Sequence, residues 1–258
     1  MTTHNLNKPL RLILLALILL SVLFASGCST APKPTADLEP PRHLAEDIIK
    51  ETTVYAIDVY DPLEPLNRRI YSFNYYFDKF LFLPVVNTYA FITPDYVEDR
   101  VSNFVSNVFE YRNFYNNLLQ LKFKKTGITL ARFVVNTTVG VAGLWDPATK
   151  WGMPRQYEDF GQTLGHYGVG NGPYLVVPIL GPSNLRDATG DLTDYATFTY
   201  TGPPAWVDDE TTGLVFTGVS AVDNRHRQSF RYYQSGSPFE YEMIRMLYTS
   251  KREIEIAK

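Results

Sequence analysis

Four glycines and a histidine precede a short apolar run in the segment TLGHYGVGNGPYLVVP, Thr163–Pro178, which is the most informative segment for the architecture of the chain. A phosphate-binding loop requires Gly-Lys-Ser/Thr leading into a helix, whereas here Gly172 is followed by Pro173 and Tyr174. The dinucleotide pattern requires a strand before the glycines and a helix after them, and the order here is reversed. We therefore interpret these glycines as architectural: they let the backbone lie close to another part of the protein or to a lipid.

The histidine of this segment, His166, lacks the neighbours that chemistry would require. Nucleophilic catalysis needs a nucleophile and an orienting acid beside the base, and the sequence has no Gly-x-Ser-x-Gly motif. Clustered metal ligands are absent too, since His226, the other histidine of the folded body, stands alone in a charged segment. We expect no catalytic residue, no metal and no cofactor, and we interpret His166 as a hydrogen-bonded structural residue.

The N-terminal residues have the pattern of a bacterial lipoprotein signal. Lys8 and Arg11 precede the apolar run Leu12–Ala25, which is too short for a hydrocarbon core of about 30 Å. Cys28 is the only cysteine and follows small residues as in a lipobox, so we expect cleavage before it and acylation of its thiol. A buried structural cysteine is the alternative. Ser29, in the place where an aspartate often keeps such proteins in the inner membrane, favours the outer membrane.

The segment after the cysteine begins with prolines among small and charged residues, which is typical of a tether. We therefore divide the chain into a signal peptide at 1–27, an acylated cysteine with its flexible tether at 28–60, and one folded body at 61–258. The net charge of −3 argues against nucleic acid as a partner. The 18 tyrosines and 16 phenylalanines suit an interface at which one end of a ring meets water.

Apolar spacing predicts a mainly α body. Asp61 is expected to cap the first helix, with Pro62 at its first position and Pro84 ending it. Pro65 removes a helix bond one turn in, so the alternative is that the regular helix starts at Pro65. Five apolar residues of this helix fall on one face, which either packs against the core or meets lipid. These residues are Leu66, Ile70, Phe73, Phe77 and Phe80.

A second helix is expected to start at Thr93 and Pro94 and to end at the cationic segment 122–127, so that the first two helices form a long amphipathic hairpin. A third helix is expected over 126–146. After it come a short strand broken by Pro178 and a loop-like segment at 195–207.

Two further helices, at 211–233 and 238–255, are expected to close the chain. Charged residues of mixed sign in these helices predict a solvated face. The basic ones are Arg225, Arg227, Arg231, Arg245, Lys251 and Arg252.

Four segments resemble the MlaA/VacJ lipoproteins: DPLEPLNRRIYSFN at 61–74, RFVVNTTVGVAGLWD at 132–146, FGQTLGHYGVGNGPYLVVPILGPSNLRDATGD at 160–191 and SPFEYEMIRMLY at 237–248. The resemblance implies a ring-like, mostly helical body with a short extended glycine-rich segment. This body would be lipid-anchored and embedded in the inner leaflet of the outer membrane, around an amphipathic channel.

The same resemblance implies a function and partners. Such proteins remove mislocalised phospholipids from the outer leaflet, associate with an outer-membrane porin trimer and pass lipid to the periplasmic lipid carrier of the Mla pathway. The motif residues expected to build the channel are Asp61, Pro62, Asn67, Arg68, Phe73, Asn74, Gly165, His166, Tyr167, Gly168, Gly170, Gly172, Pro173, Tyr174, Arg186, Asp187, Gly190 and Asp191. The alternatives are a lipoprotein that scaffolds envelope complexes without moving lipid, and a lipid hydrolase, which the missing nucleophile motif disfavours.

Overall fold

The computed structural model describes residues 59–206 and 210–258, so the expected signal peptide, Cys28 and nearly all of the tether lie outside the described residues. The described chain is mainly helical, which confirms the expected fold class. Its helical elements are α2 (Glu64–Phe77), the π-helical η2 (Asp78–Phe82), α3 (Leu83–Ile92), α4 (Asp95–Leu119), α5 (Phe123–Thr138), α6 (Pro147–Lys150), α7 (Phe160–His166), α8 (Leu185–Thr201), the 3-10 helix η3 (Pro203–Trp206), α9 (Glu210–Arg227) and α10 (Glu240–Ala257).

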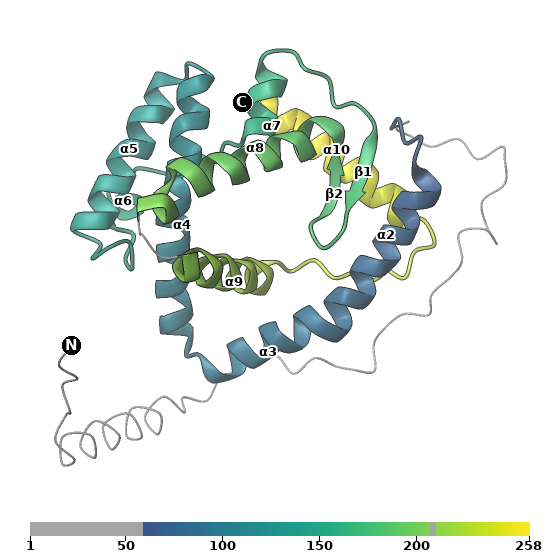
Figure 1. Ribbon diagram of the computed structural model, residues 1–258, viewed down its shortest axis with the longest axis horizontal. Coiled ribbons are helices and arrows are strands. Elements are labelled where there is room, and N and C mark those ends of the chain that lie inside the picture. The colour runs from purple at the N-terminus through teal and green to yellow at the C-terminus, as the bar shows by residue number, and fades with distance from the viewer. Residues whose placement is uncertain (1–58, 207–209) are drawn as a thin grey trace, which may run out of the picture.

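These elements follow one another around a ring (Figure 1). α2 and α3 form one side, α4 the opposite side, and α8, α7 and α10 lead back to α2. An antiparallel hairpin of β1 (Tyr174–Val177) and β2 (Gly181–Asn184) lies beside α2, with Tyr174 opposite Asn184. The strand expected before Pro178 is therefore confirmed, whereas its partner strand has no apolar alternation and was not expected.

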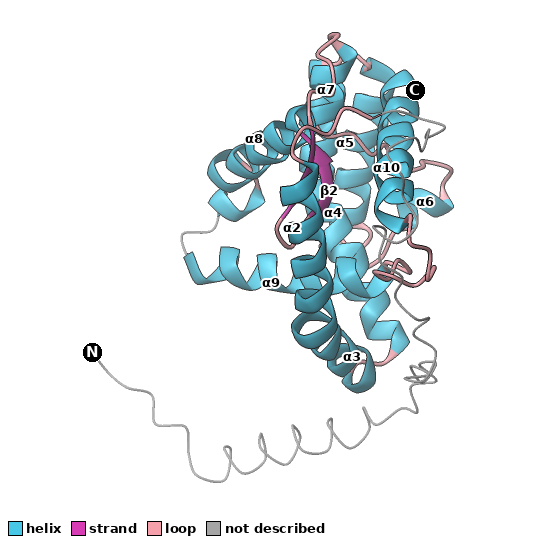
Figure 2. Ribbon diagram, turned by 90° about the vertical axis from the view of Figure 1, so that its right-hand side faces the viewer, coloured by secondary structure: helices cyan, strands magenta, loops and turns pink. Residues whose placement is uncertain are grey.

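The first helix does not end at Pro84, as the sequence predicts. α2 continues through the π-helical turn η2 into α3, and Pro84 lies in the first turn of α3 (Figure 2). A proline lacks an N–H and crowds the carbonyl four residues earlier, and the wider turn just before it relieves that conflict. The rod ends only at Ile92, after which Thr93 and Pro94 are extended.

The start of this rod agrees with the alternative in which the regular helix begins at Pro65, because α2 starts at Glu64 with this proline in its first turn. Leu63 occupies the N-cap position of α2 and makes no side-chain capping bond. The carboxylate of Asp61 is directed instead to residues far along the chain, which are described below.

A long helical hairpin is present, but it joins α4 to α5, which lie side by side (Figure 1). α4 stops at Leu119, and Leu121 in the turn has a positive φ of 58°. The cationic segment 122–127 therefore begins α5 rather than ending α4, and the first two helices meet only at a corner.

The segment 195–207 is not the loop that the sequence predicts, because α8 runs to Thr201 and η3 follows it. Threonine and tyrosine have modest helix propensity, so local sequence gives little indication of this helix. Packing explains it: the ring of Phe198 stacks on Phe109 of α4 at 5.4 Å and on Phe216 of α9 at 5.8 Å.

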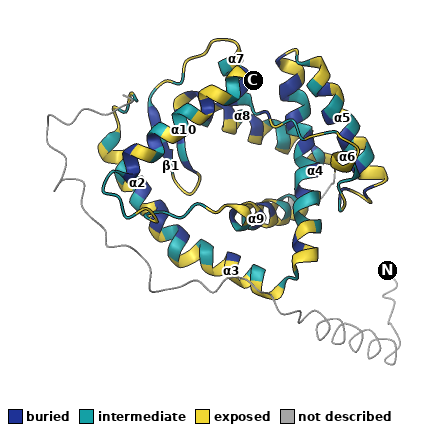
Figure 3. Ribbon diagram, turned by 180° about the vertical axis from the view of Figure 1, so that it is seen from behind, coloured by how far each residue is buried: buried dark blue, intermediate teal, exposed yellow. Residues whose placement is uncertain are grey.

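The distribution of buried side chains is inverted relative to a typical soluble domain. Among the described residues, 29 buried side chains are polar or charged and only eight are hydrophobic, four of them tyrosines. Exposed positions recur along α2, α3 and α4 (Figure 3), and many of them are large and apolar. The stripe expected on the first helix is thus exposed at Leu66, Phe73 and Phe80, and the core-facing interpretation is wrong for these residues. No described helix is both long enough and apolar enough to cross a membrane.

Two glycines set the contact between α7 and α8. A Cβ placed on Gly190 would lie 2.4 Å from the backbone nitrogen of Gly161 and 2.7 Å from its Cα. The two helix backbones therefore touch directly, at glycines that lie outside the segment Thr163–Pro178. Gly170, by contrast, has nothing within 4 Å of such a Cβ, so an added side chain has space there.

We expect Gly190→Ala to destabilise the folded protein, because the new methyl group forces α7 and α8 apart. Overpacking of this kind costs about 1–3 kcal/mol, and each kcal/mol lowers Tm by about 2–4 °C for a chain of this size. Thermal unfolding of the purified protein in detergent measures the change.

The matched control is Gly218→Ala in α9, where the space around a new Cβ is open. This variant is expected to gain up to about 1 kcal/mol from better helix propensity. Equal melting temperatures for the two variants would contradict the close packing of α7 on α8.

Candidate functional site

Two asparagines of α2 join that helix to the β-hairpin. The Asn67 side chain donates from Nδ2 to the carbonyl of Tyr174 (3.0 Å) and accepts at Oδ1 from the amide of Val176 (2.9 Å). Asn74, two helical turns later, repeats the arrangement with the carbonyl of Val177 (3.0 Å) and the amide of Ile179 (2.7 Å). The side-chain amide of each asparagine thus takes the place of a neighbouring strand, and α2 pairs with the edge of β1.

Asp61 joins this junction of α2 and β1 to α10, the C-terminal helix. Its carboxylate accepts from Asn67 Nδ2 (2.8 Å), from the Tyr241 hydroxyl (2.5 Å) and from Arg245 (3.0 Å), and its side chain is only 1% exposed. Burial and this carboxylate together raise the pKa of Tyr241, so the phenol stays protonated and donates to Asp61. The start of the body is thereby tied to α10, about 180 residues later in the chain.

The aromatic rings around this junction form the small hydrophobic core. Tyr71 and Tyr174 are each 1% exposed, and both rings lie edge-on to Tyr241 at 5.9 and 6.1 Å. The guanidinium of Arg68 lies 4.3 Å above the ring of Tyr241 and also pairs with Glu242. Tyrosine is favoured here because one side chain supplies both apolar area and a hydrogen bond.

A second buried cluster is centred on Arg252 of α10. Its guanidinium binds both oxygens of Asp159 (2.7 and 2.8 Å) and both oxygens of Asp187 (2.8 and 3.1 Å). Asp187 also accepts from the Tyr248 hydroxyl (2.8 Å) and from Arg186 (2.9 Å). Burial alone would raise the pKa of each aspartate, but the hydrogen bonds and charge of Arg252 outweigh it and lower both pKa values.

The expectation of a solvated face for the C-terminal arginines is wrong for three of them. Arg252 and Arg245 are buried, and Arg225 of α9 makes two bonds of 2.7 Å with Asp78, which is in the π-helical turn. His226 beside it lies 3.0 Å from Glu98 of α4, so it is not alone either. Arg227 and Lys251 remain exposed and agree with the expectation. Each buried partner comes from a distant part of the chain, which sequence spacing cannot reveal.

The structure also contains a buried cluster that the sequence analysis did not identify. Arg132 of α5 is 1% exposed and binds Glu110 (2.7 Å) and Asp146 (3.0 Å). Asn136 donates to Asp146 (3.0 Å) and accepts from the amide of Ala148 (3.1 Å). The sequence feature that could have indicated this cluster is the stripe of polar residues on α4, whose buried members include Glu110, Asn113, Asn116 and Asn117.

The glycine-rich segment has several structural roles. Gly168 and Gly172 have positive φ values of 85° and 66°, and a Cβ on Gly165 would lie 2.6 Å from Ile256. His166 lies edge-on to Tyr167, with ring centroids 5.2 Å apart. The Tyr167 hydroxyl donates to the carbonyl of Leu119 (2.5 Å).

Some of the remaining motif residues lie at contacts between elements, and others are exposed to solvent. The carbonyl of Pro173 accepts from the amide of Leu185 (3.0 Å), and Arg186 lies in the first turn of α8. Pro62, Phe73 and Asp191 are solvent-exposed. The buried motif residues thus hold α2, β1, α8 and α10 together, and the described residues contain no group of three or more His, Cys, Asp or Glu side chains suited to a metal.

Comparison with known proteins agrees with this architecture. Residues 59–255 match the family model described as MlaA lipoprotein. A Rickettsia prowazekii protein is 45% identical over 54% of this chain and 56% of its own length, so the match spans little more than half of that relative. The intermembrane phospholipid transport system lipoprotein MlaA of Escherichia coli K12 is 37% identical over 52% of this chain and 55% of its own length. A solved structure, from work on the structural basis for maintenance of bacterial outer membrane lipid asymmetry, aligns with a TM-score of 0.62 at 30% identity and covers 76% of this chain and 98% of its own.

We expect Arg252→Met to destabilise the protein by about 3–5 kcal/mol, because it leaves the carboxylates of Asp159 and Asp187 buried without their cation. Lys251→Met is the control, since Lys251 is 71% exposed and its ion pair at 3.6 Å is worth about 0–1 kcal/mol. Urea unfolding in detergent at neutral pH compares the two variants.

The same unfolding measurement at lower pH adds a second readout. The pKa values of both aspartates are lowered in the folded state, so the folded chain binds fewer protons than the unfolded chain near and below pH about 4. The stability of the wild type is therefore expected to fall as the pH falls through this range, and Arg252→Met is expected to show a shallower fall. Identical pH profiles would contradict the assignment of Arg252 as the group that lowers these pKa values.

Proposed function

Because the chain belongs to the MlaA lipoprotein family, we propose that it is an outer-membrane lipoprotein that removes mislocalised phospholipids from the outer leaflet and so maintains lipid asymmetry. The E. coli relative is named for intermembrane phospholipid transport, and the aligned solved structure concerns outer-membrane lipid asymmetry. Both support phospholipid as the cargo of this chain.

The observation that carries the proposal is the exposed apolar side of the α2–α3 rod, which we call the outer apolar surface. Contiguous exposed apolar residues on a folded chain mark a surface that meets another apolar phase. These side chains belong to a chain whose buried residues are mostly polar, which suits a body surrounded by lipid. The residues of the outer apolar surface are Leu66, Phe73, Tyr76, Phe80, Leu81, Val85, Phe91 and Ile92.

The ring supports a mechanism of passive transfer. A phospholipid headgroup cannot cross about 30 Å of hydrocarbon without polar surroundings, whereas its acyl chains remain stable in the apolar phase. We propose that the ring frames an amphipathic path for the headgroup, and that the motif residues hold the ring closed. Transfer of this kind breaks no covalent bond, so the proposal requires no catalytic residue, metal or cofactor.

The proposal extends to the anchor and the partners. We propose that residues 1–27 are removed, that acylated Cys28 and the tether up to residue 60 attach the body to the membrane, and that residues 61–258 form the lipid-handling domain. A porin trimer would hold the body in the inner leaflet, and a periplasmic lipid carrier of the Mla pathway would accept the lipid.

The alternative is a structural lipoprotein that scaffolds porin or other envelope complexes without moving lipid. Outer-leaflet phospholipid separates the two possibilities when it is measured in a strain that lacks this gene and in the same strain with the gene restored. A lipid carrier restores the low outer-leaflet phospholipid of the wild type. A scaffold leaves outer-leaflet phospholipid unchanged but alters the recovery of envelope complexes.

In the restored strain, Cys28→Ala is expected to yield an uncleaved or mislocalised precursor, because no thiol remains to accept the acyl chains. Membrane fractionation with metabolic fatty-acid labelling measures this. Normal cleavage and outer-membrane recovery of the variant would rule out acylation at Cys28.

Phe73→Asp is expected to weaken membrane association and lipid transfer, because it puts a charge on the outer apolar surface. A charge at membrane depth costs at least about 2.5–3.5 kcal/mol, equivalent to roughly a hundredfold or more in partitioning. Phe73→Leu, which keeps the surface apolar, is the control and should behave as wild type. Vesicle flotation of the two purified variants gives the comparison, and equal flotation would show that this surface does not enter the membrane.

A further inference from the structure

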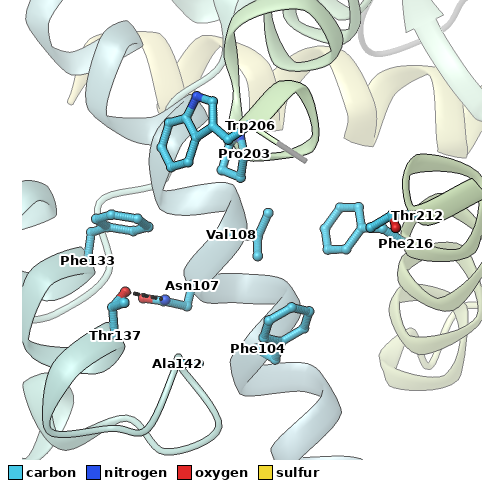
Figure 4. A pocket seen from close by; sticks show the side chains of 10 residues that line it. All are labelled: Phe104, Asn107, Val108, Phe133, Thr137, Ala142, Pro203, Trp206, Thr212 and Phe216. Atoms are coloured by element: carbon cyan, nitrogen blue, oxygen red, sulfur yellow. Dashed lines mark hydrogen bonds between the residues drawn. The ribbon is translucent and has the colours of Figure 1, made fainter. Parts of the chain in front are cut away.

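An apolar pocket of about 300 Å³ lies between the α4–α5 hairpin, η3 and α9 (Figure 4), apart from the buried residues that join α2, β1, α8 and α10. Phe104 and Val108 of α4, Phe133 of α5, Trp206 of η3 and Phe216 of α9 surround it, and no charged residue lines it. Three lining residues are polar, and two of these pair with each other, since Asn107 donates from Nδ2 to the Thr137 hydroxyl at 3.0 Å. An occupant of the pocket would therefore contact mostly carbon atoms.

The walls of the pocket are fixed by contacts outside it. Phe216 stacks on Phe198 and packs against the tilted ring of Phe109, which ties α9 to α8 and α4. The indole N–H of Trp206 donates to the carbonyl of Thr201 (3.1 Å), which holds η3 against the end of α8. A pocket with walls held in this way is largely formed before a ligand enters, which lowers the cost of binding.

Size and chemistry indicate one class of occupant. An engineered apolar cavity of about 150 Å³ stays dry and binds benzene, so a pocket of twice that volume has room for about a dozen carbon atoms. A ligand with a charged or strongly polar group would lose hydration without gaining partners in such a lining. Trp206, which lines the pocket, and Leu214 of α9 are both exposed and apolar, which suits the entry of an occupant from an apolar phase.

We propose that this pocket, at the α4 side of the ring, binds the terminal part of one acyl chain of a phospholipid. The proposal rests on the proposed function, from which it takes a membrane lipid as the ligand. One chain held here leaves the headgroup and the second chain free to move, so the pocket retains a lipid beside the protein between transfer steps. The pocket has room for about a dozen carbons, so the remainder of a longer chain stays outside it.

The test uses the full-length acylated protein in vesicles of phosphatidylethanolamine and phosphatidylglycerol. The vesicles contain a small fraction of phosphatidylcholine with a diazirine near the end of one acyl chain. After illumination, mass spectrometry maps the labelled peptides. We expect label at the pocket residues of α4, α5 and α9 in the wild type, above the level on the outer apolar surface.

Val108→Trp fills the pocket and is expected to lower this labelling by about tenfold, since losing room for two methylenes has an effect of that size. Val134→Trp is the matched control: it makes the same change on α5 at a position that is 50% exposed and does not line the pocket. Thr212→Trp, at an exposed lining position, is a second blocking variant in case the tryptophan at 108 prevents folding. Label spread evenly over the exposed surface of the wild type would overturn the proposal.

Lipid transfer between vesicles is measured with the same samples. Pocket labelling that both blocking variants leave unchanged overturns the acyl-chain site, whatever transfer shows. Pocket labelling that the blocking variants abolish, in a protein that transfers no lipid, supports the site and contradicts the transport function. The acyl-chain site and the transport function can therefore be disproved independently of each other.

Discussion

The pairing of α2 with the edge of β1 is the interaction on which the ring depends. Asn67 and Asn74 satisfy backbone groups of β1 that would otherwise be unpaired, and Asp61 carries the connection on to α10. A buried backbone group without a partner costs about 1–3 kcal/mol, and such a group finds no replacement partner in a lipid environment. The asparagines therefore have a strict geometric role, because only a side chain with both a donor and an acceptor can imitate a strand.

A polar interior and an apolar exterior follow from the same constraint. Where the surroundings are lipid, apolar burial contributes little to folding, so helices associate through hydrogen bonds and close packing. The clusters at Arg132, Arg225 and Arg252 and the contact between Gly161 and Gly190 supply both kinds of interaction. They hold the ring together without a large hydrophobic core, and this leaves many apolar residues exposed, as the proposed membrane location requires. The proposed acyl-chain pocket is the place where such residues enclose a space instead of facing outward.

Local pattern identified most of the helices, and its errors have physical causes. Pro84 was expected to end a helix, but a π-helical turn accommodates it. The segment at 195–207 has weak helix propensity, yet stacking of Phe198 on α4 and α9 makes it helical. For the site, the resemblance identified the motif residues but not their partners, because these lie far away in the sequence. Arg245 binds Asp61, 184 positions away, and Arg252 binds Asp187 and Asp159, 65 and 93 positions away.

The sequence by itself determined the mainly helical class, the apolar stripe of the first helix, and the short strand that follows the glycine-rich segment. These properties depend on backbone preferences and on a periodicity of 3.6 residues, both of which are local. Only the tertiary structure decided that Leu66, Phe73 and Phe80 face outward while Asn67 and Asn74 are buried. Periodicity shows that a helix has two unlike faces, but which of them is buried depends on what packs against it, and here that is a strand and a helix from much later in the chain.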